Sequence, residues 1–284
     1  LKTLGFSFYG FTLIHSIFFY VSMYFGLKKY VENFSLLIIV FLYKLFFYNT
    51  FISMRQSITL AIFFIILRYI DERNAFKYFL GCFIALFIHN AAVVLFPIYF
   101  INRFIMTKKK VIILNVVFLP ILLASYANLP IMDILSSIVK YLPTESAQIK
   151  FENMLGTSDD SGMNLLHTLE YFFIMLLLIL NYDQILSVGV KSEFIIKLFI
   201  FLLPIFTLFR GYEILTREKD FFTITYAIIL GYLCKINKNK YSKIVQFGTV
   251  IVCAYGFFRF IILFDNGAMM PYESYLFDSI SIFR

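Results

Sequence analysis

LFIHNAAVVLFPIYF, residues 86–100, is the stretch that determines the membrane topology of the chain. In it a histidine and an asparagine, His89 and Asn90, interrupt a run that is otherwise almost wholly apolar. The apolar residues from 76 to 101 have the composition of one long helix, or of two helices that meet at the polar pair. Polar groups are costly within such a run, so this pair needs a structural or functional reason.

The charges on both sides of this run favour two helices. RYIDERNAFK, residues 68–77, carries three basic residues, and NRFIMTKKK, residues 102–110, carries four more. One helix would place these basic segments on opposite faces of a membrane, whereas two helices place both inside, as the positive-inside rule prefers. We therefore expect a hairpin with His89 and Asn90 at its outer turn.

The composition of the whole chain assigns it to the polytopic membrane proteins. Of its 284 residues, 61% are hydrophobic and 15% are charged, against roughly 45–50% and 25% in an average globular domain. In a membrane protein the net charge of +8 marks the cytoplasmic side, so it does not indicate a nucleic-acid partner. The three cysteines are scattered, with no C-x-x-C spacing, and indicate neither a metal site nor a disulfide framework.

The expected fold is all-α, a polytopic membrane helix bundle of about ten transmembrane segments, with residues 1–284 forming one integral membrane domain. A hydrocarbon core of about 30 Å needs about 20 helical residues. The apolar runs are 6–26, 34–51, 56–70, 76–89, 91–106, 111–126, 165–182, 194–209, 221–234 and 243–264. Residues 127–164 are expected to form an extracytoplasmic loop, in which NLPIMDILSSIVKYLP has the spacing of a surface helix. Residues 265–284 are expected to form an extracytoplasmic tail.

In this topology several polar side chains share the outer face. Arg55 and Gln56 begin one span, and His89 and Asn90 lie at the hairpin turn. A short outer loop and the tail add four further candidates, which are Arg210, Glu213, Arg217 and Tyr272. Cationic residues on this face oppose the orientation rule and need another reason. The planar guanidinium of Arg makes two charge-assisted hydrogen bonds to phosphate, so a lipid-linked pyrophosphate is the expected ligand.

Each of these residues also has a purely structural interpretation. Arg55 is then an anchor that extends to the membrane interface, and His89 is a polar residue bonded to a neighbouring helix. In the same interpretation Arg210 and Arg217 pair with the acidic residues of their own segment, Glu213, Glu218 and Asp220. It is the convergence of the candidates on one face that favours a binding site.

Two of these segments together resemble a known family. MRQSITLAIFF, residues 54–64, and IALFIHNAAVVLFPIYFI, residues 84–101, resemble the Arg-Gln and Phe-His-x-Ser-Ala motifs of the EpsG-like, Wzy-type exopolysaccharide and O-antigen repeat-unit polymerases. This chain departs from the second motif, because Ile88 separates Phe87 from His89 and the Ser is absent. REKDFF, residues 217–222, and MMPYESYLF, residues 269–277, resemble later motifs of that family. The family's early Gly-x-Asp loop is absent and the chain begins at Leu1, so we expect an N-terminally truncated member.

The resemblance implies a metal-independent glycosyltransferase of the bacterial inner membrane that acts in capsule or exopolysaccharide synthesis. It would transfer a growing glycan from undecaprenyl pyrophosphate to the non-reducing end of a lipid-linked repeat unit at the outer leaflet. No cofactor is expected. The expected partners are these lipid-linked glycans, the lipid bilayer, and a flippase and chain-length regulator of the same assembly system.

In this interpretation three residues carry the chemistry. Arg55 and Arg217 stabilise the leaving pyrophosphate, and His89 acts as a general base for the acceptor hydroxyl or orients the leaving phosphate. The substrate-binding candidates are Gln56, Asn90, Arg210, Glu213 and Tyr272. If His89 is not the base, Glu213 is the next candidate.

Three other functions fit the same membrane topology. A flippase or polysaccharide transporter would also need cations at the outer face, but it should show charges along a central cavity and pseudo-symmetric halves, which are not visible in the sequence. A glycan ligase would use the same donor with another acceptor. A bundle that only organises a synthase complex would need no site at all.

Overall fold

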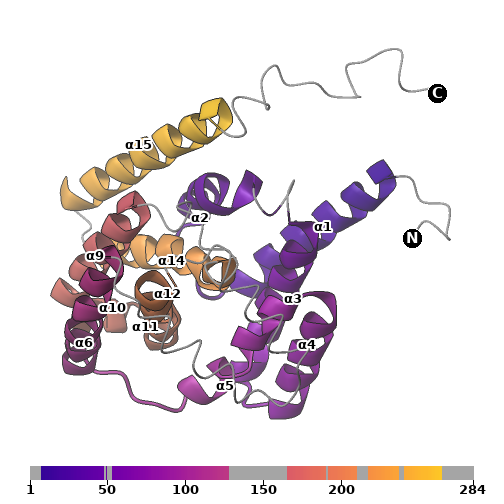
Figure 1. The fold of residues 1–284 in the computed structure, drawn as a ribbon, viewed down its shortest axis with the longest axis horizontal. Helices are drawn as coiled ribbons and strands as arrows, with labels where there is room; N and C mark the ends of the chain where they lie inside the picture. Colours follow the sequence, from indigo (N-terminus) through magenta and orange to yellow (C-terminus); the bar gives the residue numbers. More distant parts are fainter. Residues whose placement is uncertain are drawn as a thin grey trace.

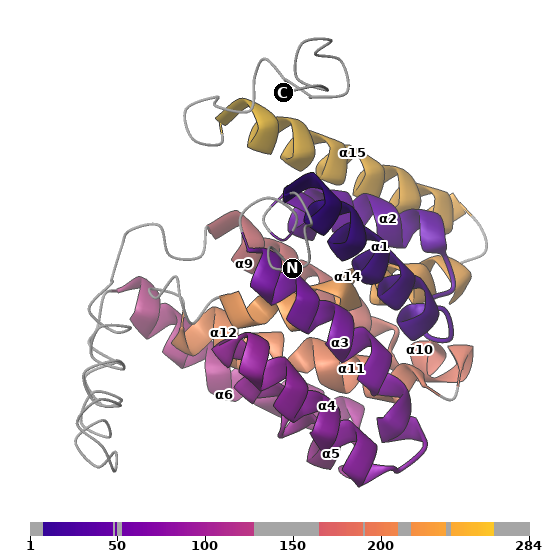
Figure 2. The same ribbon diagram turned by 90° about the vertical axis from the view of Figure 1, so that its right-hand side faces the viewer.

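The structure of the chain is a computed structural model, which describes residues 8–47, 49, 53–127, 165–189, 191–209, 217–236 and 240–263. These residues form helices and no strand. The helix α14 (Asp220–Ile236) runs through the middle of the bundle in both views (Figures 1 and 2). The all-α prediction is therefore confirmed for the described residues. The predicted outer loop beyond residue 127 and the tail 265–284 lie outside them.

The other helices are named in chain order. They are α1 (Phe8–Leu27), α2 (Phe34–Phe41), η2 (Leu42–Phe46), α3 (Met54–Asp71), α4 (Ala75–Ile88), η4 (Asn90–Leu95), α5 (Ile98–Ile101), α6 (Lys108–Tyr126), α9 (Leu165–Leu180), α10 (Tyr182–Val188), α11 (Ser192–Ile200), α12 (Leu202–Leu208), η5 (Arg217–Lys219) and α15 (Lys240–Leu263).

Local polar residues set where several helices begin. The side chains of Asn33, Asn74 and Thr107 each accept a hydrogen bond from a backbone N–H in the first turn of α2, α4 and α6. Asn and Thr favour this position because their side-chain oxygens satisfy amides that have no partner within the helix. The connection between α3 and α4 is tight, and Arg73 adopts a left-handed φ of 54° there.

The predicted hairpin at His89 and Asn90 is confirmed. Helix α4 ends at Ile88, His89 has an extended backbone, and η4 begins at Asn90. The chain then returns alongside α4, because the Tyr78 hydroxyl donates to the Leu95 carbonyl oxygen at 2.7 Å. The Tyr99 hydroxyl donates to the carbonyl oxygen of Arg73 at 3.1 Å, so the two basic segments flanking the hairpin lie at the same end.

The central helix α14 is buried along almost its whole length. Every residue from Asp220 to Cys234 is buried, and the helix packs against α2, α11 and α15. A helix that is apolar on all sides belongs in the core of a bundle rather than at its surface. This helix therefore carries its first residue, Asp220, into the interior.

Several helices expose rows of apolar side chains, which are unfavourable in contact with water. Leu13, Ile17 and Phe25 of α1 are more than half exposed, and α6 and α15 expose similar rows. Within the part of the chain that the structure describes, three helical segments are long and apolar enough to cross a membrane, namely Gly10–Leu27, Lys108–Tyr126 and Tyr241–Leu263. A fourth results if α9 and α10, which meet at 82°, count as one span. The chain is thus a helical membrane protein, and the number of about ten spans stays a prediction.

The charged residues separate toward the two ends of α3. At its C-terminal end, Asp71 accepts hydrogen bonds from Lys29, at 2.9 Å, and from Lys191 and Tyr30. Arg55 and Gln56 lie at its N-terminal end. The 18 residues of the helix separate these ends by about 27 Å. Lys29 and Lys191 thus lie at the end opposite to the candidate site. The direction in which each end faces stays a prediction.

Candidate functional site

Gln56, in the first turn of α3, joins three elements of the bundle. Its buried Nε2 donates to the backbone oxygen of Arg217 at 2.9 Å and to Oδ2 of Asp220 at 3.0 Å. The Ser53 hydroxyl donates to Oε1 of Gln56 at 3.2 Å, which fixes the orientation of the amide. The start of α3 is thereby tied to η5 and to the first residue of α14.

Asp220 is held by amides rather than by a salt bridge to a single cation. Asn49 lies after the π-helix η2, and its Nδ2 donates to Oδ2 of Asp220 at 3.4 Å and to the carbonyl oxygen of Leu45 at 3.2 Å. Together with Gln56, this residue fixes a carboxylate that is only 4% exposed. A buried carboxylate with neutral donors on one oxygen keeps its other oxygen available for chemistry.

His89 faces the same region from the hairpin turn. Its Nδ1 accepts a hydrogen bond from the backbone N–H of Ala91 at 3.2 Å, so in the neutral ring the proton lies on Nε2. Burial lowers the pKa of His89, and the positive charges of Arg55 and Arg217 lower it further. At neutral pH the side chain is therefore an uncharged imidazole with an Nε2–H donor.

Of the site residues predicted from the sequence, those that the structure describes lie in one region of the bundle. The η4 turn packs beside η5, so His89 and Arg217 approach one another from distant parts of the chain. Arg55 is exposed in the first turn of α3, and Asn90 is exposed next to His89. The remaining candidates, Arg210, Glu213 and Tyr272, lie outside the described residues.

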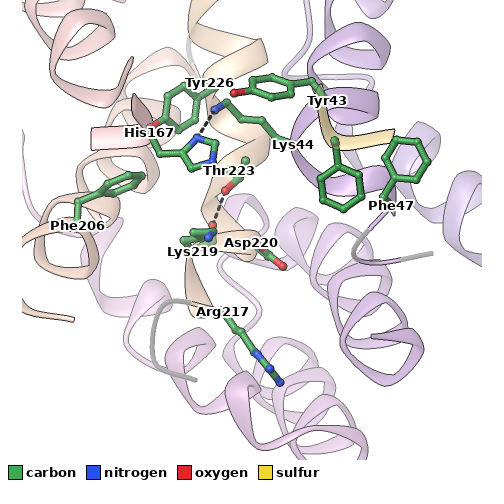
Figure 3. A pocket seen from close by; sticks show the side chains of 11 residues that line it. Tyr43, Lys44, Phe47, His167, Phe206, Arg217, Lys219, Asp220, Thr223 and Tyr226 are labelled. Atoms are coloured by element: carbon green, nitrogen blue, oxygen red, sulfur yellow. Dashed lines mark hydrogen bonds between the residues drawn. The ribbon is translucent and has the colours of Figure 1, made fainter. Parts of the chain in front are cut away.

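A cavity of about 230 Å³ extends from Arg217 and Asp220 into the bundle. We call it the polar cavity, and its lining residues are Tyr43, Lys44, Phe47, His167, Phe206, Arg217, Lys219, Asp220, Thr223, Tyr226 and Phe260. Figure 3 shows Lys44 and His167 pointing toward one another at one end, while the Arg217 side chain extends away from them. Besides Lys44, which pairs with Glu170, two cations and one carboxylate line this cavity, so it favours an anion.

Lys44 belongs to a partly buried polar group at the inner end of the cavity. It lies in the π-helix η2, a helix type that often occurs at functional sites. Its Nζ donates to Oε2 of Glu170 and lies 3.5 Å from Nδ1 of His167. The Tyr43 hydroxyl donates to the other oxygen of Glu170 at 3.0 Å. The carboxylate of Glu170 thus offsets the positive charge of Lys44.

Five residues of this region were not among the site residues predicted from the sequence, namely Lys44, Asn49, His167, Glu170 and Asp220. A signal was present, because Lys44, Asn49, His167 and Glu170 are polar residues inside apolar runs, where they are costly without partners. Their mutual proximity comes from long-range packing and is not visible in local spacing. Within the described part of the chain, no three His, Cys, Asp or Glu side chains are grouped as metal ligands would be.

Comparison with known proteins gives one match. The family model described as the EpsG family matches residues 1–274. No curated protein and no solved structure matches the chain.

Proposed function

Because this chain belongs to the EpsG family over residues 1–274, we propose that it is a polysaccharide repeat-unit polymerase. In this role it transfers a growing glycan from undecaprenyl pyrophosphate to the non-reducing end of a lipid-linked repeat unit at the outer leaflet. Family membership fits a polymerase of polysaccharides, and the apolar helices fit a reaction between two membrane-bound substrates.

The observation that carries the proposal is the combination of cations with one fixed carboxylate in a single cavity. Arg217, Lys219 and Lys44 line the polar cavity together with Asp220. A pyrophosphate leaving group gains negative charge as its bond to the sugar breaks, and positive side chains fixed in advance stabilise that charge. A glycosyl transfer also needs a group that accepts the acceptor's proton, and Asp220 is a carboxylate within the same cavity.

The proposed step is a displacement at the anomeric carbon of the donor glycan. The acceptor hydroxyl forms the new C–O bond, the C–O bond to the pyrophosphate breaks, and the electron pair leaves with undecaprenyl pyrophosphate. The proton of the hydroxyl passes to Asp220, which Gln56 and Asn49 orient. Arg55 and Arg217 bind the leaving group. His89 donates a hydrogen bond from Nε2 to a phosphate oxygen, because its Nδ1 already accepts from Ala91.

The test is to remove the positive charge and the carboxylate separately. Arg217→Ala and Asp220→Asn should each lower polymer formation, by roughly 10²–10³-fold for the missing electrostatic contact and 10²–10⁴-fold for the missing base. Arg217→Lys should restore only part of the activity, because Lys lacks the planar guanidinium. The matched control is Lys77→Ala, which removes a cation from the opposite end of the bundle.

The readout is the length distribution of surface glycan on a gel, with membrane insertion of each variant checked by immunoblot. A polymerase defect leaves a single repeat on the surface, a flippase defect removes surface glycan altogether, and a ligase defect leaves long chains on the lipid. Wild-type chain lengths in both Arg217→Ala and Asp220→Asn would overturn the proposed site.

A further inference from the structure

A second cavity, of about 370 Å³, meets the polar cavity at its inner end. We call it the apolar groove; it is bounded by α2 and η2, α9, α14 and α15. Tyr43, Lys44 and Tyr226 line both cavities. A molecule with a polar head and an apolar chain would therefore pass from one to the other at these three residues.

The groove is apolar apart from one ion pair at this junction. Its only charged lining residues among those described are Lys44 and Glu170, and they neutralise one another. Phe173 of α9 and Ile244 of α15 line the groove and are themselves 61% and 56% exposed. The groove thus opens between α9 and α15, on the side where the apolar surface of α15 would meet lipid.

We propose that the apolar groove holds the first isoprene units of a polyprenyl chain whose diphosphate lies in the polar cavity, with Lys44 at the junction. This inference rests on the proposed function and names the subsite for the lipid part of its substrate. A cavity of about 150 Å³ holds one benzene molecule. By that measure the groove accommodates about fifteen carbon atoms, or about three isoprene units.

The charge and shape of the two cavities favour this ligand over a phospholipid. Each of the two phosphate groups of a diphosphate is ionised at neutral pH, and the lining of the polar cavity has more cations than carboxylates. A phospholipid carries one phosphate and two acyl chains. Among the described residues, another cavity that shares lining residues with the polar cavity is lined by the charged Arg259, so the apolar groove is the better place for a single apolar chain. Without a ligand, the ammonium group of Lys44 donates to the carboxylate of Glu170. A bound diphosphate would compete with that carboxylate for the ammonium group.

Gly248 gives a way to block the groove without disturbing the helices. It lines the groove, and no atom lies within 4 Å of the place where a Cβ would be added. Because the added Cβ meets no atom outside its own helix backbone, a side chain can begin there without a clash, and Gly248→Phe is expected to extend its ring over the groove that Gly248 lines. The matched control is Ala254→Phe, because Ala254 is an exposed residue of the same helix α15 that lines none of the described cavities.

The experiment uses the full chain in nanodiscs of phosphatidylethanolamine and phosphatidylglycerol. The probe is farnesyl diphosphate with a diazirine on its terminal isoprene unit, and cross-linked peptides are identified by mass spectrometry. We expect cross-links to the peptides that contain Phe173 and Gly248, with competition by unlabelled undecaprenyl diphosphate. Gly248→Phe should lower this cross-linking at least tenfold, and Ala254→Phe should leave it unchanged.

Three results would overturn the inference. They are cross-links that map elsewhere in the wild-type protein, undiminished cross-linking in Gly248→Phe, and equal labelling of the groove by a diazirine-bearing phosphatidylglycerol. The mapping in the wild-type protein decides the matter even if Gly248→Phe does not fold. Failure of the proposed function has a different signature, because Arg217→Ala and Asp220→Asn would then polymerise normally whatever the groove binds.

Discussion

At the scale of single residues, the tautomer of His89 decides which of two roles it can take. A general base needs an unprotonated nitrogen that faces the substrate, yet Nδ1 is occupied by the N–H of Ala91. The free nitrogen, Nε2, carries the proton in the neutral ring. The arrangement therefore favours a hydrogen-bond donor to phosphate, and it leaves the role of base to a carboxylate such as Asp220.

His89→Gln tests this assignment, because the Gln amide still donates a hydrogen bond but does not titrate. We expect less than a tenfold loss of polymerisation rate in His89→Gln. His89→Ala should lose about 1.5–3 kcal/mol of stabilisation, or roughly ten- to a hundredfold in rate, since it removes a bond to a charged group. The measurement is the rate of polymer formation from purified lipid-linked repeats, with membrane-inserted protein quantified for each variant.

The pH dependence of the polymerisation rate tests the role of His89 independently. Because the pKa of His89 is lowered by burial and by Arg55 and Arg217, it stays neutral until the pH falls below its usual value of about 6.5. Protonation of Nδ1 would break the bond from Ala91 but leave the Nε2–H donor in place, so the ratio of wild-type to His89→Gln rates should not rise with pH between about 5 and 8. Taking the ratio cancels the titration of Glu218, whose pKa is raised to about 7 by burial. A ratio that rises with pH through the pKa of His89 would restore it as the base.

The residues of the site differ in how far the sequence predicts them. Gln56 and His89 are recognisable because each is a polar residue beside or within an apolar run, in a motif that resembles a family pattern. Asp220 needs more information, since its partners Gln56 and Asn49 are 164 and 171 positions away in the chain. Only the packing of α14 against the start of α3 makes that carboxylate part of the site.

At the scale of elements, the hairpin at His89 was predictable from the distribution of basic residues on both sides of it. The two basic segments around residues 68–77 and 102–110 have to lie on one side, and the helix break between them follows. The π-helix η2 was not predictable, since nothing in LYKLF distinguishes it from an ordinary helix turn. The 82° bend between α9 and α10 was not predictable either. It occurs at Asn181, and the segment contains no proline or glycine that would indicate a bend.

The contact of α1 with α3 depends on the absence of a side chain at one position. A Cβ added to Gly26 would lie 2.3 Å from the carbonyl oxygen of Phe64, and backbone atoms cannot rotate aside. Gly26→Ala should therefore force the helices apart and cost about 1–3 kcal/mol, although Ala is the better helix former. The midpoint of thermal unfolding in detergent, followed by circular dichroism, measures this loss.

Gly248→Ala is the matched control for this substitution, because open space surrounds its added Cβ. It should leave the midpoint unchanged or raise it, since Ala adds helix propensity without a clash. An unfolding midpoint of Gly26→Ala equal to that of the wild type would show that α1 and α3 do not depend on this close approach.

At the scale of the whole molecule, the sequence predicts a helical membrane bundle and the separation of its charges, because both follow from composition. It does not predict the depth of each helix. The segment 221–234 has the composition of one more apolar span, yet it forms the buried middle of the bundle. The segment 243–263 has a similar composition and lies at the surface. Which apolar helix is enclosed depends on shape and partners rather than on hydropathy.

The orientation of the molecule is testable with single cysteines in a chain from which Cys82, Cys234 and Cys253 have been replaced. Asn90→Cys should react with an impermeant maleimide added to intact spheroplasts, because it is exposed at the end of the bundle that we expect to face outward. Lys109→Cys should react only after the membrane is permeabilised, as the positive-inside rule requires. The measurement is the fraction of each variant that is labelled, and the reverse pattern would invert the bundle and move the proposed site to the cytoplasmic face.

The enclosure of α14 also has a consequence for biogenesis. A nascent chain is made from its N-terminus, and early parts associate before later ones exist. The helices α2, α3 and α11 are therefore inserted first, and Gln56 and Asn49 then lie in the membrane without the carboxylate that they bond in the finished protein. Amides without partners are unfavourable in lipid. The insertion of α14 supplies Asp220 as their partner and completes the core of the bundle. We therefore expect a chain that ends before this helix to expose these polar groups and to be degraded faster than a chain that includes it.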